Sequence, residues 1–374
     1  MRPLLFTVCL LTVASASLMF QPAAARPKLA AEYTIDQSTE TPTTASKAEN
    51  RPLFSIVRND RTGFIDSTGN VVIPPEFSGW YTGIRFDEGL APVTLGHHWG
   101  YIDTTGRVVI RTRFDSAGSF SEGLAPVGIA TKRDGNALDD FQYGYINRSG
   151  KLVIKLQFKE THGFSEGLGR IVVDGKWGFI DTTGKIVIEP KFRMAYWFSE
   201  GLALVSIGDT MVYIDHAGRV VSNPEYEYWP TGFSGGLAAA GKNGKWGYIS
   251  KDWKFVIEPQ FDQVAERFSE GLAVVRVGNK CGYIDRSGKM IISPLFDNAS
   301  YFSNGLAPVQ IDKRYGYINK NGEVVIKPVF VEAYPFKGGL AAVTSNENVN
   351  RVQCCWPHWD YIDTSGRYIW KAEK

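Results

Sequence analysis

The sequence predicts an all-β protein made of tandem repeats, and two observations lead to that prediction. A short phrase, an aromatic residue followed by Ile and then by a turn, returns nine times along the chain. The 374 residues also include 39 glycines, which suits a turn-dense β protein, and 44% hydrophobic residues, which suffice for a large core. We therefore expect three-stranded antiparallel meanders stacked as an open or loosely closed superhelical array, with a closed β-propeller-like ring as the alternative.

Residues 177–188 show one copy of the phrase and why it forms a hairpin. The segment from Trp177 to Asp181 is rich in aromatic and β-branched residues, which favours a strand. Asp181 opens a turn by accepting backbone N–H groups, and Gly184 permits the positive φ that completes it. Gly178 lies within the strand, where a glycine indicates close approach of another backbone. The residues after the turn form the returning strand.

The aromatic and Ile positions of the phrase are filled in all nine copies. The aromatic residues are Phe64, Tyr101, Tyr145, Phe179, Tyr213, Tyr248, Tyr283, Tyr317 and Tyr361.

A further strand and a connector precede each hairpin. Leu272–Val277 is an apolar run that ends at the short turn Gly278–Lys280, and turns of this kind are hairpin signals. In the connector before this run, Pro259 stops the previous strand from extending. Phe261 and Phe268 are expected to anchor that connector under the next unit.

Two features favour the open or loosely closed array over the closed ring. The chain divides into complete meanders from Leu53 to Trp370, so no strand is left over to complete the sheet at the opposite end. The nine units also exceed the roughly four to eight blades of most propellers. In either arrangement the units must stack, because a three-stranded sheet of this size cannot bury both its faces alone.

The Trp-Gly pairs that open several hairpins resemble those of the WG-repeat family of bacterial proteins. The resemblance covers roughly residues 52–370, and Met211, Cys281 and Asp360 depart from the strict motif. It implies a β-rich tandem repeat and, in most members, no assigned biochemical activity. We interpret the signature positions as structural, packing one unit on the next. They are Trp99, Gly100, Trp177, Gly178, Trp246, Gly247, Gly282 and Gly316.

The beginning of the chain predicts export. Residues 1–25 combine Arg2, an uncharged apolar run and the small residues Ala23–Ala25, which is typical of a secretory signal peptide. Residues 26–50 are polar and predict a disordered linker. Residues 51–374 form the repeat domain of nine units. We expect a periplasmic, cell-surface or secreted protein without a membrane span once the signal is cleaved.

Composition and motifs favour binding over catalysis. The net charge of +2 is spread without a basic stripe, so we expect no nucleic-acid partner. No nucleophile elbow, metalloprotease, phosphate-loop or dinucleotide motif is present, so we predict no enzyme activity and no cofactor. We expect a non-enzymatic scaffold that binds a protein or a cell-envelope polymer through one face. The alternatives are a glycan-active enzyme on a propeller-like ring and a carbohydrate-binding module.

Two rows of acidic residues recur with the repeat. An acid opens six of the nine hairpin turns. We interpret it as a turn cap rather than as a metal or acid–base ladder, because Asn147, Asn319 and Ser250 fill the same place in the other three without an ionisable group. A second acid stands in the Phe-Ser-Glu-Gly phrase of the connector, where a solvated connector is favoured over a cation-binding row. The two rows are Asp66, Asp103, Asp181, Asp215, Asp285 and Asp363, and Glu122, Glu166, Glu200 and Glu270.

Two insertions fall at the same place in the unit, the turn between its first and second strands. They are residues 131–142 and 345–358. Insertions in repeat proteins gather on one face, which is often the binding face. The candidate ligand-binding residues within them are Asp134, Asp139, Asp140, Trp356 and His358.

Cysteine usage leaves two possibilities open. In an exported protein, Cys281 could pair with Cys354 or Cys355, or all three thiols could stay unpaired. No metal site is expected, because adjacent cysteines lack the Cys-x-x-Cys spacing of a zinc site.

Overall fold

The structure is a computed structural model that describes residues 51–78, 84–134, 137–222, 231–265, 267–345 and 359–372, with the side chains of residues 132–139 outside the description. The predicted signal peptide and linker, residues 1–50, lie outside the described residues. All regular structure in the described residues is β. They contain no helix of the length and apolarity needed to cross a membrane.

The predicted fold class is confirmed: the chain forms tandem antiparallel meanders, one after another. The first strands of the units are β1 (Phe54–Arg58), β4 (Leu90–Leu95), β8 (Leu124–Asp134), β12 (Leu168–Val173), β15 (Ala203–Ile207), β17 (Ala238–Lys242), β21 (Leu272–Val277), β25 (Ala307–Ile311) and β29 (Leu340–Thr344). The second strands, which carry the aromatic-Ile phrase, are β2 (Arg61–Ile65), β5 (His98–Asp103), β9 (Ala137–Asn147), β13 (Lys176–Asp181), β16 (Thr210–Ile214), β18 (Lys245–Ile249), β22 (Lys280–Asp285), β26 (Arg314–Ile318) and β30 (Asp360–Asp363).

Within the described residues, eight units have a regular third strand and five gain a short fourth strand from the connector. The third strands are β3 (Val71–Ser78), β6 (Val108–Phe114), β10 (Leu152–Phe158), β14 (Ile186–Phe192), β19 (Phe255–Phe261), β23 (Met290–Phe296), β27 (Val324–Phe330) and β31 (Tyr368–Trp370). The connector strands, which the sequence did not predict, are β7 (Ser116–Ala117), β11 (Glu160–Ser165), β20 (Gln263–Val264), β24 (Asn298–Ala299) and β28 (Glu332–Ala333).

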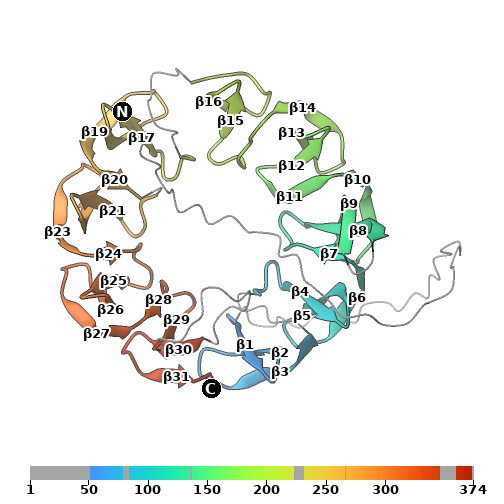
Figure 1. Ribbon diagram of the computed structural model, residues 1–374, viewed down its shortest axis with the longest axis horizontal. Coiled ribbons are helices and arrows are strands. Elements are labelled where there is room, and N and C mark those ends of the chain that lie inside the picture. The colour runs from blue at the N-terminus through green and yellow to red at the C-terminus, as the bar shows by residue number, and fades with distance from the viewer. Residues whose placement is uncertain are drawn as a thin grey trace, which may run out of the picture.

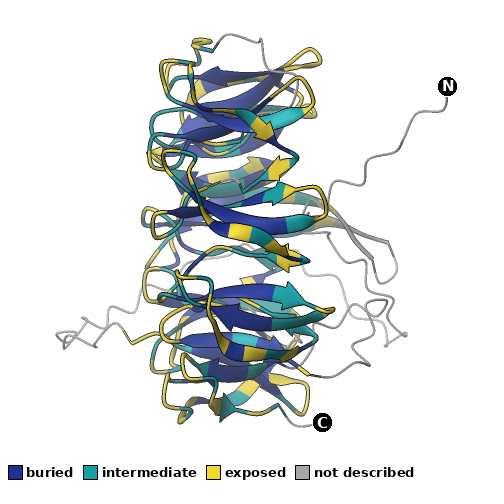
Figure 2. Ribbon diagram, turned by 90° about the vertical axis from the view of Figure 1, so that its left-hand side faces the viewer, coloured by how far each residue is buried: buried dark blue, intermediate teal, exposed yellow. Residues whose placement is uncertain are grey.

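The sheets follow one another in chain order around a ring (Figure 1). Connector strands such as β20 and β24 lie on its inner side, which we call the inner wall, and third strands such as β23 and β27 lie on its outer side. Seen edge-on, the ring is a thick disc in which buried residues occupy the strands and exposed residues gather at the turns on both faces (Figure 2). Each pair of neighbouring sheets encloses its own part of the core.

A backbone contact inside each sheet explains the glycine of the Trp-Gly pair. The pairing of β13 with β14 shifts register twice between Trp177 and Ile180. The irregular backbone of β14 therefore presses on Gly178, where an added Cβ would lie 2.7 Å from the Pro190 nitrogen and 2.8 Å from the Ile188 oxygen. The close approach predicted for this glycine is confirmed.

One pair of contacts joins each unit to the next. The aromatic ring of the hairpin packs on the Phe of the following connector, as in Tyr283 and Phe302, whose ring centroids are 4.9 Å apart. The Tyr283 hydroxyl also donates a hydrogen bond of 2.8 Å to the Ser300 carbonyl oxygen. Burial of these hydroxyls raises the pKa of Tyr283 above its usual value. The same ring pair recurs in Phe64–Phe86, Tyr101–Phe120, Tyr145–Phe164, Phe179–Phe198, Tyr213–Phe233, Tyr248–Phe268 and Tyr317–Phe336.

The array is of the loosely closed kind, because its last unit meets its first. The Tyr361 hydroxyl donates a 2.8 Å hydrogen bond to the Ser55 carbonyl oxygen, and the rings of Tyr361 and Phe54 lie 5.5 Å apart. Leu340 and Trp359 complete a shared hydrophobic cluster with the first unit. Among the described residues no strand pairing crosses this junction, so side-chain packing and the Tyr361 hydrogen bond join the two ends.

Candidate functional site

The aspartates that open the hairpin turns are turn caps, as the sequence predicted. Asp181 Oδ1 accepts hydrogen bonds from the Thr183 N–H at 2.9 Å, the Thr183 hydroxyl at 2.6 Å and the Lys185 N–H at 3.0 Å. These bonds hold the pKa of Asp181 below its usual value, against a smaller opposing effect of burial. Asn147 and Asn319 make the same backbone contacts without a charge. Each of these side chains is tied to its own turn rather than directed into a shared cavity.

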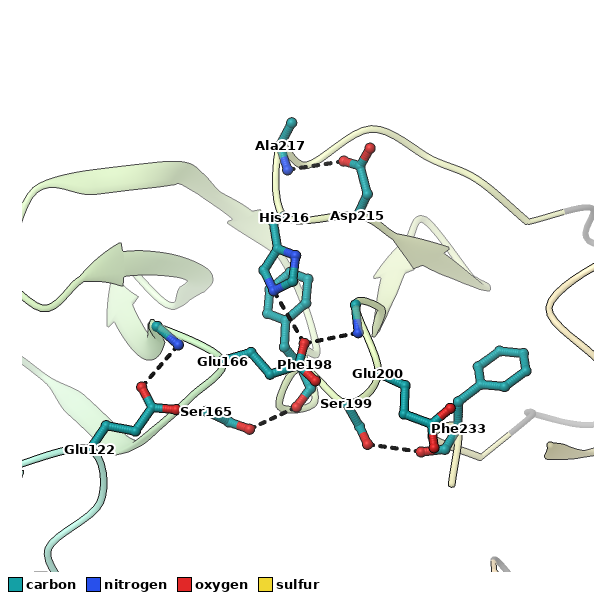
Figure 3. A network of polar contacts seen from close by, with 12 residues as sticks. Glu122, Ser165, Glu166, Phe198, Ser199, Glu200, Asp215, His216, Ala217 and Phe233 are labelled. Carbon is teal, nitrogen blue, oxygen red and sulfur yellow. Dashed lines mark hydrogen bonds and ion pairs between the residues drawn. The ribbon is translucent and has the colours of Figure 1, made fainter. Parts of the chain in front are cut away.

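The glutamates of the connector phrase link neighbouring units and are more than a solvated row. The Gly201 N–H donates a 2.9 Å hydrogen bond to Glu166 (Figure 3). The Gly236 N–H donates one of 2.9 Å to Glu200. A basic side chain from the hairpin turn of the next unit approaches four of the carboxylates, as His216 Nε2 does at 3.2 Å from Glu166; the other three are those of Glu88, Glu200 and Glu270. We call this series the glutamate ladder. The other donors to it are Gly123 to Glu88, Gly167 to Glu122 and Gly305 to Glu270, with Gly339 to Asn304 as an uncharged member.

The first insertion continues two strands rather than forming an irregular loop on one face. The strands β8 and β9 extend through it and pair as far as Asp134 with Ala137. Asp140 forms an ion pair with Lys159. Asp134 and Asp139 lie in the paired strands, with side chains outside the description, and Trp356 and His358 lie outside the described residues altogether. Their assignment to a binding face stays a prediction.

The described residues bear on only part of the predictions about metal binding and cysteine pairing. Among the described residues, no group of three or more His, Cys, Asp or Glu side chains could hold a metal ion. Cys281 is buried with a free thiol, and burial raises the pKa of that thiol above its usual value. Its predicted alternative partners, Cys354 and Cys355, lie outside the described residues.

A single position in the connector varies strongly from unit to unit and gathers in one place. It is the residue immediately before the connector Phe, which we call the connector slot. In the fifth to eighth units the slot holds Trp197, Gly232, Arg267 and Tyr301. All four line one cavity of about 600 Å³ on the inner wall. The residues that repeat thus hold the ring together, while those that differ shape its inner wall.

Gly232 leaves the middle of this cavity open. An added Cβ there would meet no atom within 4 Å, and the backbone φ is not in the left-handed region. The flanking slots carry Trp197 on one side and Arg267 and Tyr301 on the other. The cavity is therefore a trough with large side chains at both ends.

Trp197 presents one face to solvent and has the other backed by an arginine. Its side chain is 58% exposed, and the Arg170 guanidinium lies 5.5 Å from the ring. Arg170 also lies 5.3 Å from Trp177 and donates a 2.6 Å hydrogen bond to the Ala195 carbonyl oxygen, which fixes its place. A cation held against an indole restricts the ring's orientation.

Two further guanidiniums border the cavity without a carboxylate partner among the described residues. Arg267 lies 5.1 Å from the Tyr301 ring. Arg276 donates to the Gln263 amide oxygen at 3.1 Å and to the Asn279 carbonyl oxygen at 3.1 Å. This wall of the cavity therefore carries positive charge that the described side chains do not neutralise.

Sequence reasoning missed this site, although the signal was present. The predictions rested on positions that repeat, whereas the connector slot is notable for changing from Arg85, Ser119 and Gly163 to Trp197 and Tyr301. Aligning the units on the connector Phe would have exposed the slot. It could not have shown that four successive slots line one cavity, because that depends on how the sheets are arranged.

The geometry defines a tandem β-repeat protein whose sheets are joined by aromatic packing and the glutamate ladder. The chain belongs to the WG containing repeat family, as the sequence suggested. The family profile matches residues 63–96, 99–129, 143–177, 177–210, 213–246, 246–281, 282–315 and 315–348.

Solved structures resemble the chain at low sequence identity. The crystal structure of a eukaryotic initiation factor has a TM-score of 0.56 and 11% identity, covering 85% of this chain and 95% of that one. Citrobacter koseri AztD has a TM-score of 0.38 and 14% identity over 85% of this chain and 93% of its own. Kluyveromyces lactis Hsv2p has a TM-score of 0.35 and 9% identity over 49% and 70%. The first likeness concerns the fold alone. No curated protein sequence matches the chain.

Proposed function

We propose that this protein is an exported, non-enzymatic scaffold that binds a cell-envelope polymer along its inner wall. The observation that carries the proposal is the cavity of about 600 Å³ lined by four successive connector slots. Cavities of about 300–1,000 Å³ are typical of ligand sites. The lining slots are also the positions at which the units differ, so the recurrent contacts that join the units do not account for Trp197, Arg267 and Tyr301.

Binding is favoured over catalysis by the side chains that surround the cavity. The described lining residues include no Asp, Glu or His. Glycoside hydrolysis generally needs two carboxyl groups about 5–10 Å apart. The recurrent acids of the ring already serve other purposes, since the aspartates cap turns and the glutamates link units. These arrangements support a scaffold rather than a glycan-active enzyme.

Pull-down experiments test the binding part of the proposal. Tagged protein should recover a polymer from cell-envelope extracts, and Gly232→Trp should abolish the recovery by filling the trough. Trp already occupies the same slot in the fifth unit, so the variant should fold. Ser119→Trp is the matched control, because it adds the same side chain to the slot of the third unit, away from the cavity. Recovery of no partner, or equal recovery by Gly232→Trp, would contradict the proposal.

Export is supported by the apolar run and the small residues at 23–25. Expression in a bacterial host should place the protein outside the cytoplasm with Arg26 as its first residue. Fractionation followed by N-terminal sequencing measures this directly. Intact chain confined to the cytoplasm would overturn this part of the proposal.

A further inference from the structure

We propose that the inner-wall cavity binds an acidic saccharide, lying lengthwise across the fifth to eighth units. This inference rests on the proposed scaffold function and adds the chemical class of its ligand. Six side chains or positions carry it: Trp197, Gly232, Gln263, Arg267, Arg276 and Tyr301.

The charge of the cavity favours an anion. Arg267 and Arg276 both line it, and neither pairs with a carboxylate of the described residues. A guanidinium is weakly hydrated and presents its donors in a fixed fork that matches a carboxylate. Arg267 is exposed on the inner wall, so its donors are open to a ligand. A carboxylate entering the trough would meet the open donors of Arg267 and the positive charge of Arg276, whose own donors bond Gln263 and the Asn279 carbonyl oxygen.

The aromatic side chains favour a saccharide over an acidic peptide. Trp197 is 58% exposed and Tyr301 is 37% exposed, so each offers a flat face at one end of the trough. The C–H face of a pyranose ring stacks on such a surface, while the hydroxyls at its rim remain free for hydrogen bonds. Arg170 behind Trp197 holds the indole in place before any ligand arrives.

The Gln263 side-chain amide lines the same cavity and can bind the hydroxyl groups of a saccharide. The Gln263 side chain is exposed, and its oxygen accepts a 3.1 Å hydrogen bond from Arg276. That bond orients the amide and leaves its NH₂ group, with two donors, directed away from Arg276. Gln263 can therefore bind a hydroxyl group of the ligand, next to the Arg276 guanidinium whose positive charge attracts a carboxylate.

The length of the cavity favours an oligomer over a single sugar. Its lining begins at Trp197 in the fifth unit and ends at Tyr301 in the eighth, with the open slot of Gly232 between them. A ligand that touches both aromatic ends must therefore run across several units. An extended uronate chain has that shape and carries a carboxylate on each ring.

Binding assays with matched probes test the ligand class. Isothermal titration of the mature protein would use trimers of galacturonate, glucuronate and mannuronate, their methyl esters, and neutral trimers. At least one acidic trimer should bind, and its methyl ester should bind roughly 10- to 100-fold more weakly, because the charged hydrogen bonds are lost. Equal binding of acid and ester would overturn the inference.

Substitutions assign that binding to the cavity. Arg267→Met should remove most of the difference between acid and ester, and Trp197→Ala should weaken both by roughly tenfold. Arg267 and Trp197 are exposed, so both variants should keep the thermal stability of the parent protein, which circular dichroism verifies. The matched control is Arg111→Met, at an exposed position on β6 of the outer side. Acid binding that survives Arg267→Met, or that falls equally with Arg111→Met, would place the ligand elsewhere.

The two proposals fail in distinguishable ways. If Gly232→Trp abolishes capture of an envelope partner but no acidic trimer binds, the scaffold stands and the acidic saccharide is wrong. If that partner is a protein, the inference is also wrong. If neither a partner nor a trimer binds, both proposals fail.

Discussion

Gly178 shows how one residue type is imposed by its neighbours. The atoms that its missing Cβ would meet, the Pro190 nitrogen and the Ile188 oxygen, belong to the backbone of the adjacent strand and cannot rotate away. The same approach occurs at Gly63, Gly100, Gly144, Gly247, Gly282 and Gly316. The glycine is therefore required by the sheet itself, independently of any ligand.

Gly178→Ala should lower the free energy of unfolding by about 1–3 kcal/mol, the usual cost of overpacking. Urea denaturation followed by circular dichroism measures the change. Gly232→Ala is the matched control, because its Cβ would lie in open space, and it should be close to neutral. Equal stability of Gly178→Ala and the parent would show that the strand can move aside.

The sequence predicted this glycine's role because the glycine recurs in seven of the nine repeats, but it could not explain the two exceptions. The fifth and ninth units have Val212 and Asp360 in the same place. Asp360 Oδ1 accepts a 2.9 Å hydrogen bond from the Ala372 N–H. That contact depends on the folded unit and has no simple signal in the sequence.

At the scale of the element, the hairpin turn of one unit packs on the third strand of the unit before it. The added Cβ of Gly218 would lie 3.1 Å from the Ile188 side chain, and that of Gly322 would lie 3.1 Å from Ile292. Between the fifth and sixth units both positions change together. Ser222 stands in the place of the Ile, and Trp253 stands in the place of the Gly. The Trp253 ring lies 5.1 Å from Tyr213 and 5.8 Å from Phe233. A larger turn residue thus offsets a smaller strand residue.

Trp253→Gly should destabilise the protein by about 3–5 kcal/mol through the cavity it leaves. Relief of backbone strain should offset about 1 kcal/mol of this loss, because Trp253 has a φ of 60° that glycine adopts more easily. Ser222→Ile alone should also destabilise it, by crowding Trp253 and removing the hydrogen bond between the Ser222 hydroxyl and the Tyr213 N–H. The double variant restores the common Ile–Gly pair and should recover part of the loss. Strictly additive effects in a urea-denaturation cycle would refute the compensation.

The meanders themselves followed from the alternation of aromatic and β-branched residues, but the connector strands did not. β24 consists of Asn298 and Ala299, which carry no strand pattern. They pair with Gln310 and Val309 only because the fold brings the connector alongside β25. Short strands of this kind depend on tertiary position, which local propensity does not encode.

At the scale of the whole molecule, carboxylates with lowered pKa values link stability to pH. Burial alone would raise the pKa of Glu200, but the Gly236 N–H and Lys251 more than offset it, so the pKa lies below its usual value. A carboxylate with a lowered pKa in the folded state stabilises the fold above its unfolded pKa, and this stabilisation is lost as pH falls through the folded value. Asp181 and Asp285 have lowered pKa values and act in the same direction.

As these carboxylates are protonated, the thermal midpoint should therefore fall as the pH drops from about 5 towards 2. Circular dichroism at a series of pH values measures it. Glu200→Gln keeps an acceptor for Gly236 without a titrating group, as Asn304 does for Gly339, and should lose less stability on acidification. A midpoint that rises as the pH falls would have the wrong sign for this account.

Closure of the array is the feature that the sequence left open, and the reason is geometric. Whether the ends meet depends on a small rotation between neighbouring units that accumulates over the whole chain. No single residue determines that rotation. The lack of a leftover strand to complete the opposite end's sheet correctly predicted a loose junction, but it did not predict the contact between the two ends. In the structure, Tyr361 makes to Ser55 the same type of hydroxyl–carbonyl bond that Tyr283 makes to Ser300.

This equivalence gives a direct test of closure. Tyr361→Phe and Tyr283→Phe each remove one buried hydroxyl and leave one carbonyl without its donor, so each should cost about 1–2 kcal/mol. Burial raises the pKa of Tyr361 to about 12, which agrees with a hydroxyl enclosed at the junction rather than exposed at a free end. Urea denaturation of the two variants measures both costs under the same conditions. If the ends meet in solution, the two costs should match. If Tyr361→Phe were neutral while Tyr283→Phe was costly, the last unit would lack the first as its neighbour and the array would be open.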